Sequence, residues 1–139
     1  MADLDGDGKD DLITGSYSPG TIYWFRCKAG RTFEDKRVLV EPKKDGTPRL
    51  TASSVAAVDW DGDGLIDLIV GNIEGQVLYL KNTGTKKEPR FGDPVVLEAG
   101  GKAIKVEHGD AGPCVVDWDG DGRKDLIVGD GATGITFFK

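Results

Sequence analysis

Short apolar runs separated by glycine recur along the chain of 139 residues. Three of them share one pattern, Leu-Ile followed by a β-branched residue and a closing glycine, at residues 12–15, 68–71 and 126–129. A second run follows each of these, at residues 21–25, 76–80 and 135–138. Short runs rich in branched and aromatic side chains and bounded by glycine predict β-strands. Because no window shows a convincing 3.6-residue period, we expect an all-β chain.

Two more kinds of run complete a repeating unit. One stands before the second and third Leu-Ile pairs, at residues 55–58 and 114–116, and the other appears at residues 38–40 and 95–97. The runs are apolar at consecutive positions, which implies sheets covered on both faces. We therefore predict β-propeller blades of four antiparallel strands that stack face to face, about two and three-quarter blades in this chain.

The expected blades divide one propeller fragment, residues 1–139, into residues 1–53, 54–112 and 113–139. The first strand of the first blade is truncated, since only Met1 and Ala2 precede its acidic loop, and the fourth strand of the third blade is missing. Stacked repeats bury a core that a single blade cannot bury alone. We expect the Leu-Ile pairs, Trp24, Tyr79 and Phe137 to lie in that core between blades.

Each unit also carries the acidic loop Asp-X-Asp-Gly-Asp-Gly-X-X-Asp, and the loops start 56 and then 58 residues apart. Carboxylates at alternate positions of a tight turn point into one hollow, and such a set of oxygens suits Ca²⁺. Positions 1, 3, 5 and 9 supply carboxylates and position 7 a backbone carbonyl, so we expect three calcium ions per chain. The predicted ligands are Asp3, Asp5, Asp7, Lys9 and Asp11, then Asp59, Asp61, Asp63, Leu65 and Asp67, then Asp117, Asp119, Asp121, Arg123 and Asp125.

Three competing interpretations of the loops are a solvated acidic turn, an EF-hand and a site for a different metal. Aspartate and glycine both favour turns, but three copies in phase argue for a shared ion site. An EF-hand needs a bidentate Glu at position 12, where this chain has Thr14, Val70 and Val128. No His or Cys recurs in the loops, so zinc fits poorly, and magnesium prefers fewer protein ligands and more water.

The motif Asp-X-Asp-Gly-Asp-Gly-X-X-Asp-Leu-Ile-X-Gly resembles the calcium loop of the FG-GAP/VCBS repeats, and the resemblance covers essentially the whole chain. It implies the β-propellers of integrin α-chain heads, fungal lectins and many bacterial secreted proteins. Phe91-Gly92 matches the Phe-Gly element of the family, whereas Phe33 lacks its glycine. The Gly-Ala-Pro element survives only as Gly15, Gly71 and Gly129, so the chain looks closer to the bacterial VCBS-like branch.

Composition supports the metal hypothesis and excludes one class of partner. The formal charge is −6 and the sequence pI is about 4.7, which argue against nucleic acid as a ligand. The three loops hold 13 of the 24 acidic residues, and three Ca²⁺ would bring the formal charge to about zero. No transmembrane run is present, so we expect no membrane insertion.

The expected setting is extracellular. Weak calcium modules need the roughly millimolar Ca²⁺ found outside cells. Met1-Ala2-Asp3 is no signal peptide, so we interpret the chain as a piece of a secreted or cell-surface parent whose export signal is absent here. Cys27 and Cys114 stand at non-equivalent positions, and the simplest expectation is two buried free thiols; a disulfide would have to bridge the first and third blades.

For function, we favour a non-catalytic module that binds glycan or protein ligands. The connectors at residues 41–53 and 98–112 are polar, rich in Gly and Pro and dissimilar, as ligand-contacting loops often are. Trp60 and Trp118 either pack beside the ion or stack on sugars. A polysaccharide lyase or hydrolase is the alternative, with His108 as its general base or acid, and a purely structural scaffold is another.

Self-association is the expected partner interaction. The outer faces of the first and last blades carry the same apolar runs as the inner faces, and uncovered apolar faces mark association surfaces. A head-to-tail contact makes a ring only if its rotation closes. Two chains supply about six blades, within the range of known propellers. We therefore predict a dimer that forms a six-bladed ring.

Overall fold

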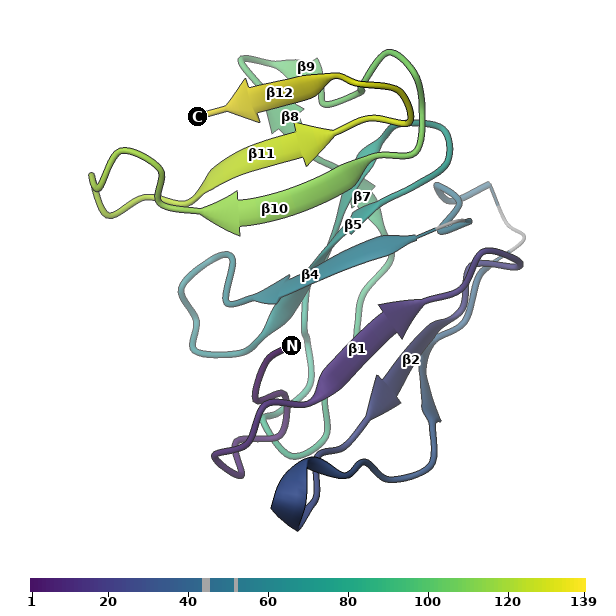
Figure 1. Ribbon diagram of the computed structural model, residues 1–139, viewed down its shortest axis with the longest axis vertical. Helices are drawn as coiled ribbons and strands as arrows, with labels where there is room; N and C mark the ends of the chain where they lie inside the picture. The colour runs from purple at the N-terminus through teal and green to yellow at the C-terminus, as the bar shows by residue number, and fades with distance from the viewer. Residues whose placement is uncertain (44–45, 52) are drawn as a thin grey trace.

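The computed structural model describes residues 1–43, 46–51 and 53–139, and it contains three successive antiparallel sheets of three or four strands each (Figure 1). The first sheet contains β1 (Leu12–Gly15), β2 (Ile22–Phe25) and β3 (Arg37–Val40). The second contains β4 (Ser54–Val58), β5 (Asp67–Gly71), β6 (Val77–Leu80) and β7 (Val95–Val96). The third contains β10 (Gly112–Val116), β11 (Asp125–Gly129) and β12 (Ile135–Phe138). Strands adjacent in sequence are adjacent in each sheet, so every sheet is a meander.

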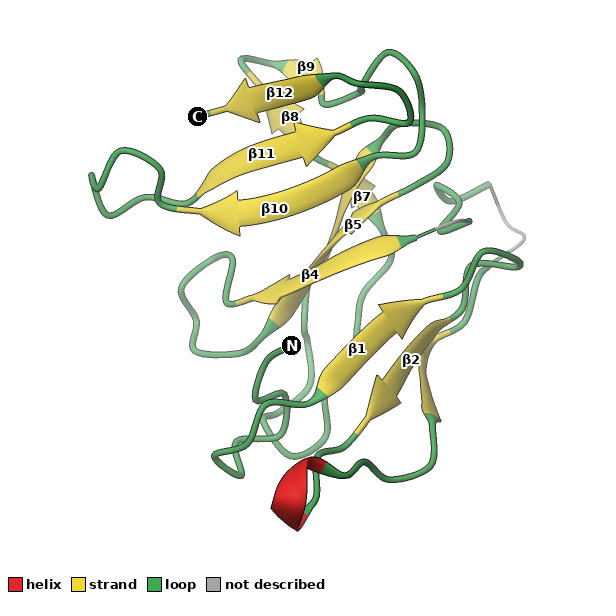
Figure 2. Cartoon of the chain, in the orientation of Figure 1, coloured by secondary structure: helices red, strands yellow, loops and turns green. Residues whose placement is uncertain are grey.

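The prediction of an all-β chain is confirmed. Within the described ranges the only helical segment is the single 3₁₀ turn η1 (Ala29–Arg31), drawn red in Figure 2. None of these ranges contains a helix long and apolar enough to cross a bilayer. Ala2 pairs with Asp11 as an isolated bridge beside β1, where the other two sheets have a full first strand.

The three sheets stack face to face, with β4 lying between β1 and β10 (Figure 1). Side chains alternate across a strand, so neighbours in β5 enter different cores. Leu68 and Val70 pack toward the first sheet, and Ile69 packs toward the third. Burial of consecutive residues in β5 confirms that the apolar runs of the second sheet are covered on both faces.

The core between the first and second sheets joins side chains from both, and all its central members are buried. It contains Leu4, Ile13, Ile22, Trp24, Leu50, Leu68, Val70, Leu78 and Leu80. The core between the second and third sheets contains Ile69, Val77, Ile104, Val106, Ala111, Leu126 and Val128. Burying each such side chain contributes about 1.5–3 kcal/mol, so the contact between sheets is the main source of stability.

The closing glycines of β1 and β5 permit this close approach of the sheets. A Cβ at Gly71 would overlap the carbonyl oxygen of Ala111, and one at Gly15 would overlap Ser53. The equivalent Gly129 has nothing near its missing Cβ. The glycine is therefore required wherever another sheet follows in the chain.

The outer face of the third sheet is uncovered, which corrects one expectation. Phe137 was predicted to lie in the core between sheets, but it is 45% exposed, and Ile135 beside it is 76% exposed. Their equivalents in the first sheet, Trp24 and Ile22, are buried because the second sheet covers them. Trp24 therefore matches the prediction, Tyr79 is partly buried against the second core, and Phe137 does not match.

The expectation for the cysteines is also wrong in part. Cys27 and Cys114 are both free, as expected. Cys27 is only half-buried and Cys114 is exposed. Cys114 lies opposite Ile127 in the β10–β11 ladder, on the same uncovered face as Phe137.

The second connector is more ordered than its composition predicts. Within residues 98–112, β8 (Glu98–Ala99) and β9 (Lys102–Ala103) form a small hairpin. Ile104 and Val106 then enter the second core, because their backbone bonds to Val77 and Gly75 hold the segment against the edge of β6. The first connector, residues 41–53, includes residues 44–45 and 52, which lie outside the described ranges.

Candidate metal centre

The acidic loops at residues 59–67 and 117–125 join the first two strands of their sheets, β4 to β5 and β10 to β11. The first acidic loop, residues 3–11, leads into β1 in the same way. Each loop turns sharply at the glycines of positions 4 and 6. In the middle loop, Gly62 and Gly64 have φ of 81° and 85°, a left-handed conformation that only glycine adopts without strain.

A network of carboxylates and backbone amides fixes each loop. In the middle loop, Asp59 accepts from Gly62 N at 2.8 Å and from Gly64 N at 3.0 Å. Asp61 accepts from Asp63 N at 3.2 Å, and Asp63 accepts from Leu65 N at 2.9 Å. The third loop repeats all four contacts at equivalent residues. The carboxylates are therefore oriented by the backbone that carries them.

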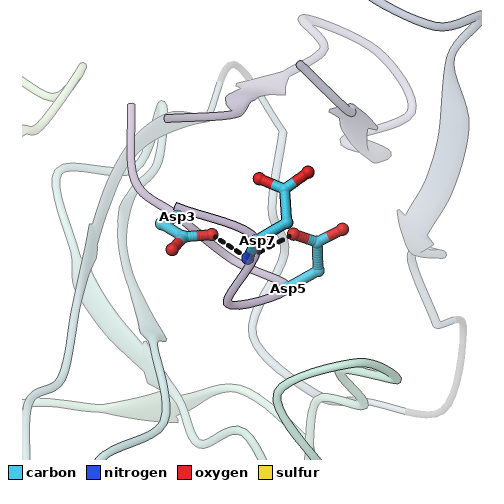
Figure 3. A group of neighbouring side chains, drawn as sticks. All are labelled: Asp3, Asp5 and Asp7. Carbon is cyan, nitrogen blue, oxygen red and sulfur yellow. Dashed lines mark hydrogen bonds between the residues drawn. The ribbon is translucent and has the colours of Figure 1, made fainter. Parts of the chain in front are cut away.

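The first loop differs at one contact, which Figure 3 shows. The amide of Asp7 donates to Asp3 at 3.0 Å and also to Asp5 at 3.2 Å (Figure 3). Gly8 N donates to the other oxygen of Asp3 at 2.9 Å, as in the other loops. Asp3, Asp5 and Asp7 can each offer one oxygen within 4.8 Å of the others.

The other two loops bring a different triplet together. In the second loop, Asp59, Asp61 and Asp67 offer oxygens within 4.8 Å of one another, and in the third loop Asp117, Asp119 and Asp125 do so. Among the described residues, Asp11, Asp63 and Asp121 stand outside these sets. Lys9, Leu65 and Arg123, predicted to offer carbonyls, donate their amides to the position-5 carboxylates. Their role as ligands stays a prediction.

The carboxylate at position 9 has a structural role that sequence reasoning missed. Asp67 is fully buried and accepts from Trp60 N at 3.0 Å and Asn82 N at 2.7 Å. Tyr79 donates its hydroxyl to Asp67 at 3.2 Å, and burial raises the pKa of Tyr79, with the charge of Asp67 adding to the effect. The buried aspartate therefore joins the start of the loop to the end of β6.

We call the buried position-9 aspartate and the two backbone amides that it accepts the clasp. The first repeat has the whole clasp, and the third repeat has only one of its two amides. Asp11 accepts from Leu4 N at 3.3 Å and from Cys27 N at 2.7 Å. Asp125 accepts from Trp118 N at 2.9 Å, but its Oδ1 is buried without a hydrogen-bond partner. Among the described residues, no amide takes the place that the amides of Cys27 and Asn82 take in the first two repeats. The signal that could have revealed the clasp is the aspartate placed directly before each Leu-Ile pair.

A basic side chain lies against every loop. Lys81 pairs with Asp61 and, at 3.0 Å, with Asp63; Lys139 pairs with Asp119 and, at 3.5 Å, with Asp121. The Lys81 ammonium holds the pKa of Asp61 below its usual range, and Asp61 raises the pKa of Lys81 in turn. Lys139 lowers the pKa of Asp119 in the same way.

The first loop has two such cations. Arg26 pairs with Asp5 and lies 3.7 Å from Asp7, and Lys9 pairs with Asp7 at 2.8 Å. The hydrogen bond from Lys9 lowers the pKa of Asp7. These cations reduce the repulsion among the carboxylates, which is otherwise severe at such short separations.

Position 2 of the first two loops is a packing position between sheets. Leu4 is almost fully buried in the first core, and Trp60 is partly buried against the second. Trp118 is 67% exposed, on a side of the third sheet that no described residue covers. For Trp60 the structure supports packing; Trp118 has a free surface on the same face as Phe137.

The only histidine, His108, is exposed and its Nδ1 lies 2.8 Å from Oδ2 of Asp130. The hydrogen bond to Asp130 raises the pKa of His108, and His108 lowers the pKa of Asp130. Asp130 also accepts the amides of Ala132 at 3.0 Å and Gly134 at 2.8 Å. The pair therefore closes the turn between β11 and β12.

A hollow on the described surface lies away from His108. It has a volume of about 860 Å³ and is lined by residues 39–43 and 46–51 with the segment 91–94. Most of its wall is the first connector, which sequence reasoning favoured for ligand contact. His108 does not line it.

Comparison with known proteins agrees with the repeats. The sequence matches the FG-GAP-like repeat at residues 3–70 and again at residues 59–128. Cartilage acidic protein 1 of Mus musculus is 30% identical over 134 residues, and that of Homo sapiens is 28% identical over 134 residues. These matches cover 94% of this chain but 20% of each relative, so the chain spans about a fifth of their length. No solved structure matches the chain.

Proposed function

The chain belongs to the FG-GAP-like repeat family, as its motifs predicted, and on that premise we propose a non-catalytic, calcium-stabilised β-propeller module that binds glycan or protein ligands outside the cell. One observation carries the proposal: three acidic loops share one orienting network of carboxylates and amides. Because the network recurs at equivalent positions in three repeats, it indicates that the same orientation of the carboxylates is needed in each loop.

The donor set of each loop fits Ca²⁺. It consists of oxygens only, and three carboxylates in each loop reach within 4.8 Å of one another. Calcium takes six to eight oxygens at about 2.3–2.6 Å in flexible geometry, so backbone carbonyls and water would complete the shell. Position 9 contributes in the second and third loops through Asp67 and Asp125, and position 5 contributes in the first through Asp7.

Calcium is expected to stabilise the folded chain by mass action, since the unfolded chain cannot assemble these oxygens. The test is thermal unfolding of the full chain in millimolar Ca²⁺, in chelator, and in Mg²⁺ at the same concentration. A ligand at 100 times its dissociation constant contributes about 2.7 kcal/mol per site, which predicts a rise in Tm of several degrees with Ca²⁺. An equal rise with Mg²⁺, or none with Ca²⁺, would contradict the calcium proposal.

The stacking of the three sheets supports a propeller. Ile13, Ile22 and Trp24 of the first sheet pack against the second, and Ile69, Val77 and Tyr79 of the second pack against the third. Their equivalents in the third sheet are Ile127, Ile135 and Phe137, which face outward. On the opposite side, β3 of the first sheet exposes Val38. The outer face of the third sheet and the outer face of the first sheet therefore carry the same kinds of residues as the two faces that meet between successive sheets.

We propose that a second copy of this chain covers these faces, so that two chains form a ring of six blades. Light scattering in calcium at micromolar concentration is expected to give twice the chain mass. Phe137→Asp places a charge on the outer face of the third sheet and should give a monomer. Tyr17→Asp, at another exposed aromatic, should leave the dimer intact. A folded monomer for the unmodified chain would refute the ring.

The hollow beside the first connector is the proposed ligand site. Pockets that bind small molecules typically measure about 300–1,000 Å³, and this hollow falls within that range. A glycan array probed in calcium tests it, with Arg49→Ala inside the hollow and Arg90→Ala, another exposed arginine, as the matched control. Glycan binding lost in Arg49→Ala alone supports the site. Binding unaffected by Arg49→Ala places the ligand elsewhere.

The extracellular setting follows from the same ion. Solvent-exposed loops of this kind are expected to bind calcium weakly, and such sites fill only at the millimolar concentrations found outside cells. Secretion of the parent protein, and its place in the bacterial VCBS-like branch, are part of this proposal.

A further inference from the structure

Against each acidic loop lies one basic residue that occupies an equivalent position in every repeat. Each directly follows the second strand after its loop: Arg26 after β2, Lys81 after β6 and Lys139 after β12. The strand register fixes this equivalence, because Leu12 pairs with Phe25, Leu68 with Leu80 and Leu126 with Phe138. The next residue therefore stands beside the buried aspartate of position 9 in all three repeats.

The backbone around this position is held rigidly in the first two repeats. Asn82, which follows Lys81, donates its amide to buried Asp67 at 2.7 Å. Cys27, which follows Arg26, donates to buried Asp11 at 2.7 Å. The clasp thus anchors the chain one residue beyond each basic side chain, and the side chain extends over the loop.

Each of these side chains reaches the carboxylate oxygens that the loop backbone leaves free. In the middle loop, Oδ1 of Asp61 accepts Asp63 N and Oδ1 of Asp63 accepts Leu65 N, whereas both Oδ2 atoms face Lys81. Lys139 faces Oδ2 of Asp119 and Asp121 in the third loop. Arg26 faces Oδ2 of Asp5 and Asp7 in the first.

The position-3 carboxylate that each cation contacts also belongs to the set of oxygens that could hold a metal ion in every loop. A divalent cation and an ammonium or guanidinium group repel each other when both approach one carboxylate at contact distance. The side chain must therefore leave before the ion gains its full shell. These residues are distinct from the ligands themselves, since a cation cannot coordinate a metal.

We propose that Arg26, Lys81 and Lys139 are tethered counter-cations, which neutralise the loops without metal and compete with Ca²⁺ for the carboxylate at position 3 of each loop. The inference rests on the proposed calcium function. On this proposal, the three basic residues set the calcium affinity of the loops. They weaken calcium binding, so the loops bind calcium only when its concentration is high. It also predicts that the acidic loops keep their fold when calcium is withdrawn.

The test removes the basic side chain from one loop at a time in the full chain and measures calcium binding at both loops. Lys81→Met keeps the length and apolar stem of the side chain but removes its charge, and Lys139→Met does the same in the third loop. Calcium titrations followed by ¹H–¹⁵N NMR read each loop separately, through the amide of Gly64 in the second and of Gly122 in the third. Lys81→Arg preserves the charge, and Lys102→Met, at an exposed position of β9, controls for loss of a lysine elsewhere.

The expected result is tighter calcium binding at the altered loop alone, whereas damage to the fold would weaken binding. Loss of two exposed ion pairs should lower the calcium dissociation constant roughly 3- to 30-fold. Lys81→Met should tighten binding at Gly64 and leave Gly122 unchanged, and Lys139→Met should do the reverse. Lys81→Arg and Lys102→Met should behave like the unmodified chain at both amides.

The outcomes separate this inference from the calcium function. If the unmodified chain binds calcium but Lys81→Met binds with equal or lower affinity at Gly64, the counter-cation idea is wrong and the calcium function stands. If neither the unmodified chain nor Lys81→Met responds at millimolar calcium, both proposals fail. If only Lys81→Met responds, the competition is demonstrated and the proposed function of the unmodified loop is refuted.

Discussion

Replacing Asp67 with alanine tests the structural part of the account without any metal. Asp67 is fully buried and accepts three hydrogen bonds, from Trp60 N, Asn82 N and the Tyr79 hydroxyl. Alanine would leave the buried amide of Asn82 and the partly buried amide of Trp60 without this partner, where β6 ends and where the loop begins. The loss should therefore appear even in chelator.

The magnitude follows from the contacts. A hydrogen bond to a charged group contributes about 1.5–3 kcal/mol, and each buried donor left without a partner costs about 1–3 kcal/mol. Contacts to one carboxylate are not additive, and removing a buried charge recovers some desolvation energy. We expect Asp67→Ala to lose about 3–5 kcal/mol of unfolding free energy, a large part of the 5–15 kcal/mol typical of a domain.

Asp125→Ala is the matched control, because the equivalent aspartate is equally buried but holds only Trp118 N. Its expected loss is about 1–2 kcal/mol. Urea unfolding in chelator, followed by tryptophan fluorescence, measures both variants on one scale. Asp67→Asn keeps one oxygen acceptor and should lie between alanine and the unmodified chain. Equal losses for Asp67→Ala and Asp125→Ala would refute the clasp.

Two further predictions concern packing and pH. Gly71→Ala should lose about 1–3 kcal/mol or more of unfolding free energy, because its new Cβ meets the Ala111 carbonyl. Gly129→Ala, which has open space at its Cβ, should change the unfolding free energy by less than about 0.5 kcal/mol. Urea unfolding measures both variants, and equal losses would contradict the packing argument. The pKa of His108, followed by NMR of its ring, should lie above its ordinary value of about 6.5 and fall toward it in Asp130→Asn. Because that pKa is raised, the stabilising effect of the pair is present below about pH 6.5 and is lost as pH rises through the folded pKa; a pKa unchanged by Asp130→Asn contradicts the pairing.

The strands could be predicted from sequence because their pattern is local. Leu-Ile pairs closed by glycine mark β1, β5 and β11, and the acidic loops between strands set the repeat. Phe33 and Phe91 each stand 26 residues before the next acidic loop, and they form the equivalent bridges Cys27–Phe33 and Asn82–Phe91. These features depend on the residues of one repeat and its turns.

The exposure of Phe137 and Cys114 could not be predicted in the same way. Their sequence context resembles that of more buried positions in the other sheets, and they differ because no described residue covers their face of the third sheet. The hairpin of β8 and β9 was missed for a different reason. Its polar and glycine-rich sequence predicts a loop, while the bonds from Ile104 and Val106 to β6 and its turn are long-range.

The candidate metal site was predictable in composition but not in geometry. The sequence identifies the carboxylates, but it does not show that Asp67 and Asp11 hold backbone amides as well. Nor does it show that the residue after the second strand beyond each loop reaches positions 3 and 5. Both facts depend on antiparallel register, which places residues about 15 positions apart side by side.

The most direct test of calcium binding by all three loops is native mass spectrometry of the full chain, in millimolar calcium and after chelation. The account predicts three calcium ions per chain, lost together with chelator, and two chains with six ions in the assembled species. Alanine at Asp59, Asp61 and Asp67 together should remove one ion per chain. A folded chain that carries no calcium under these conditions would contradict the account.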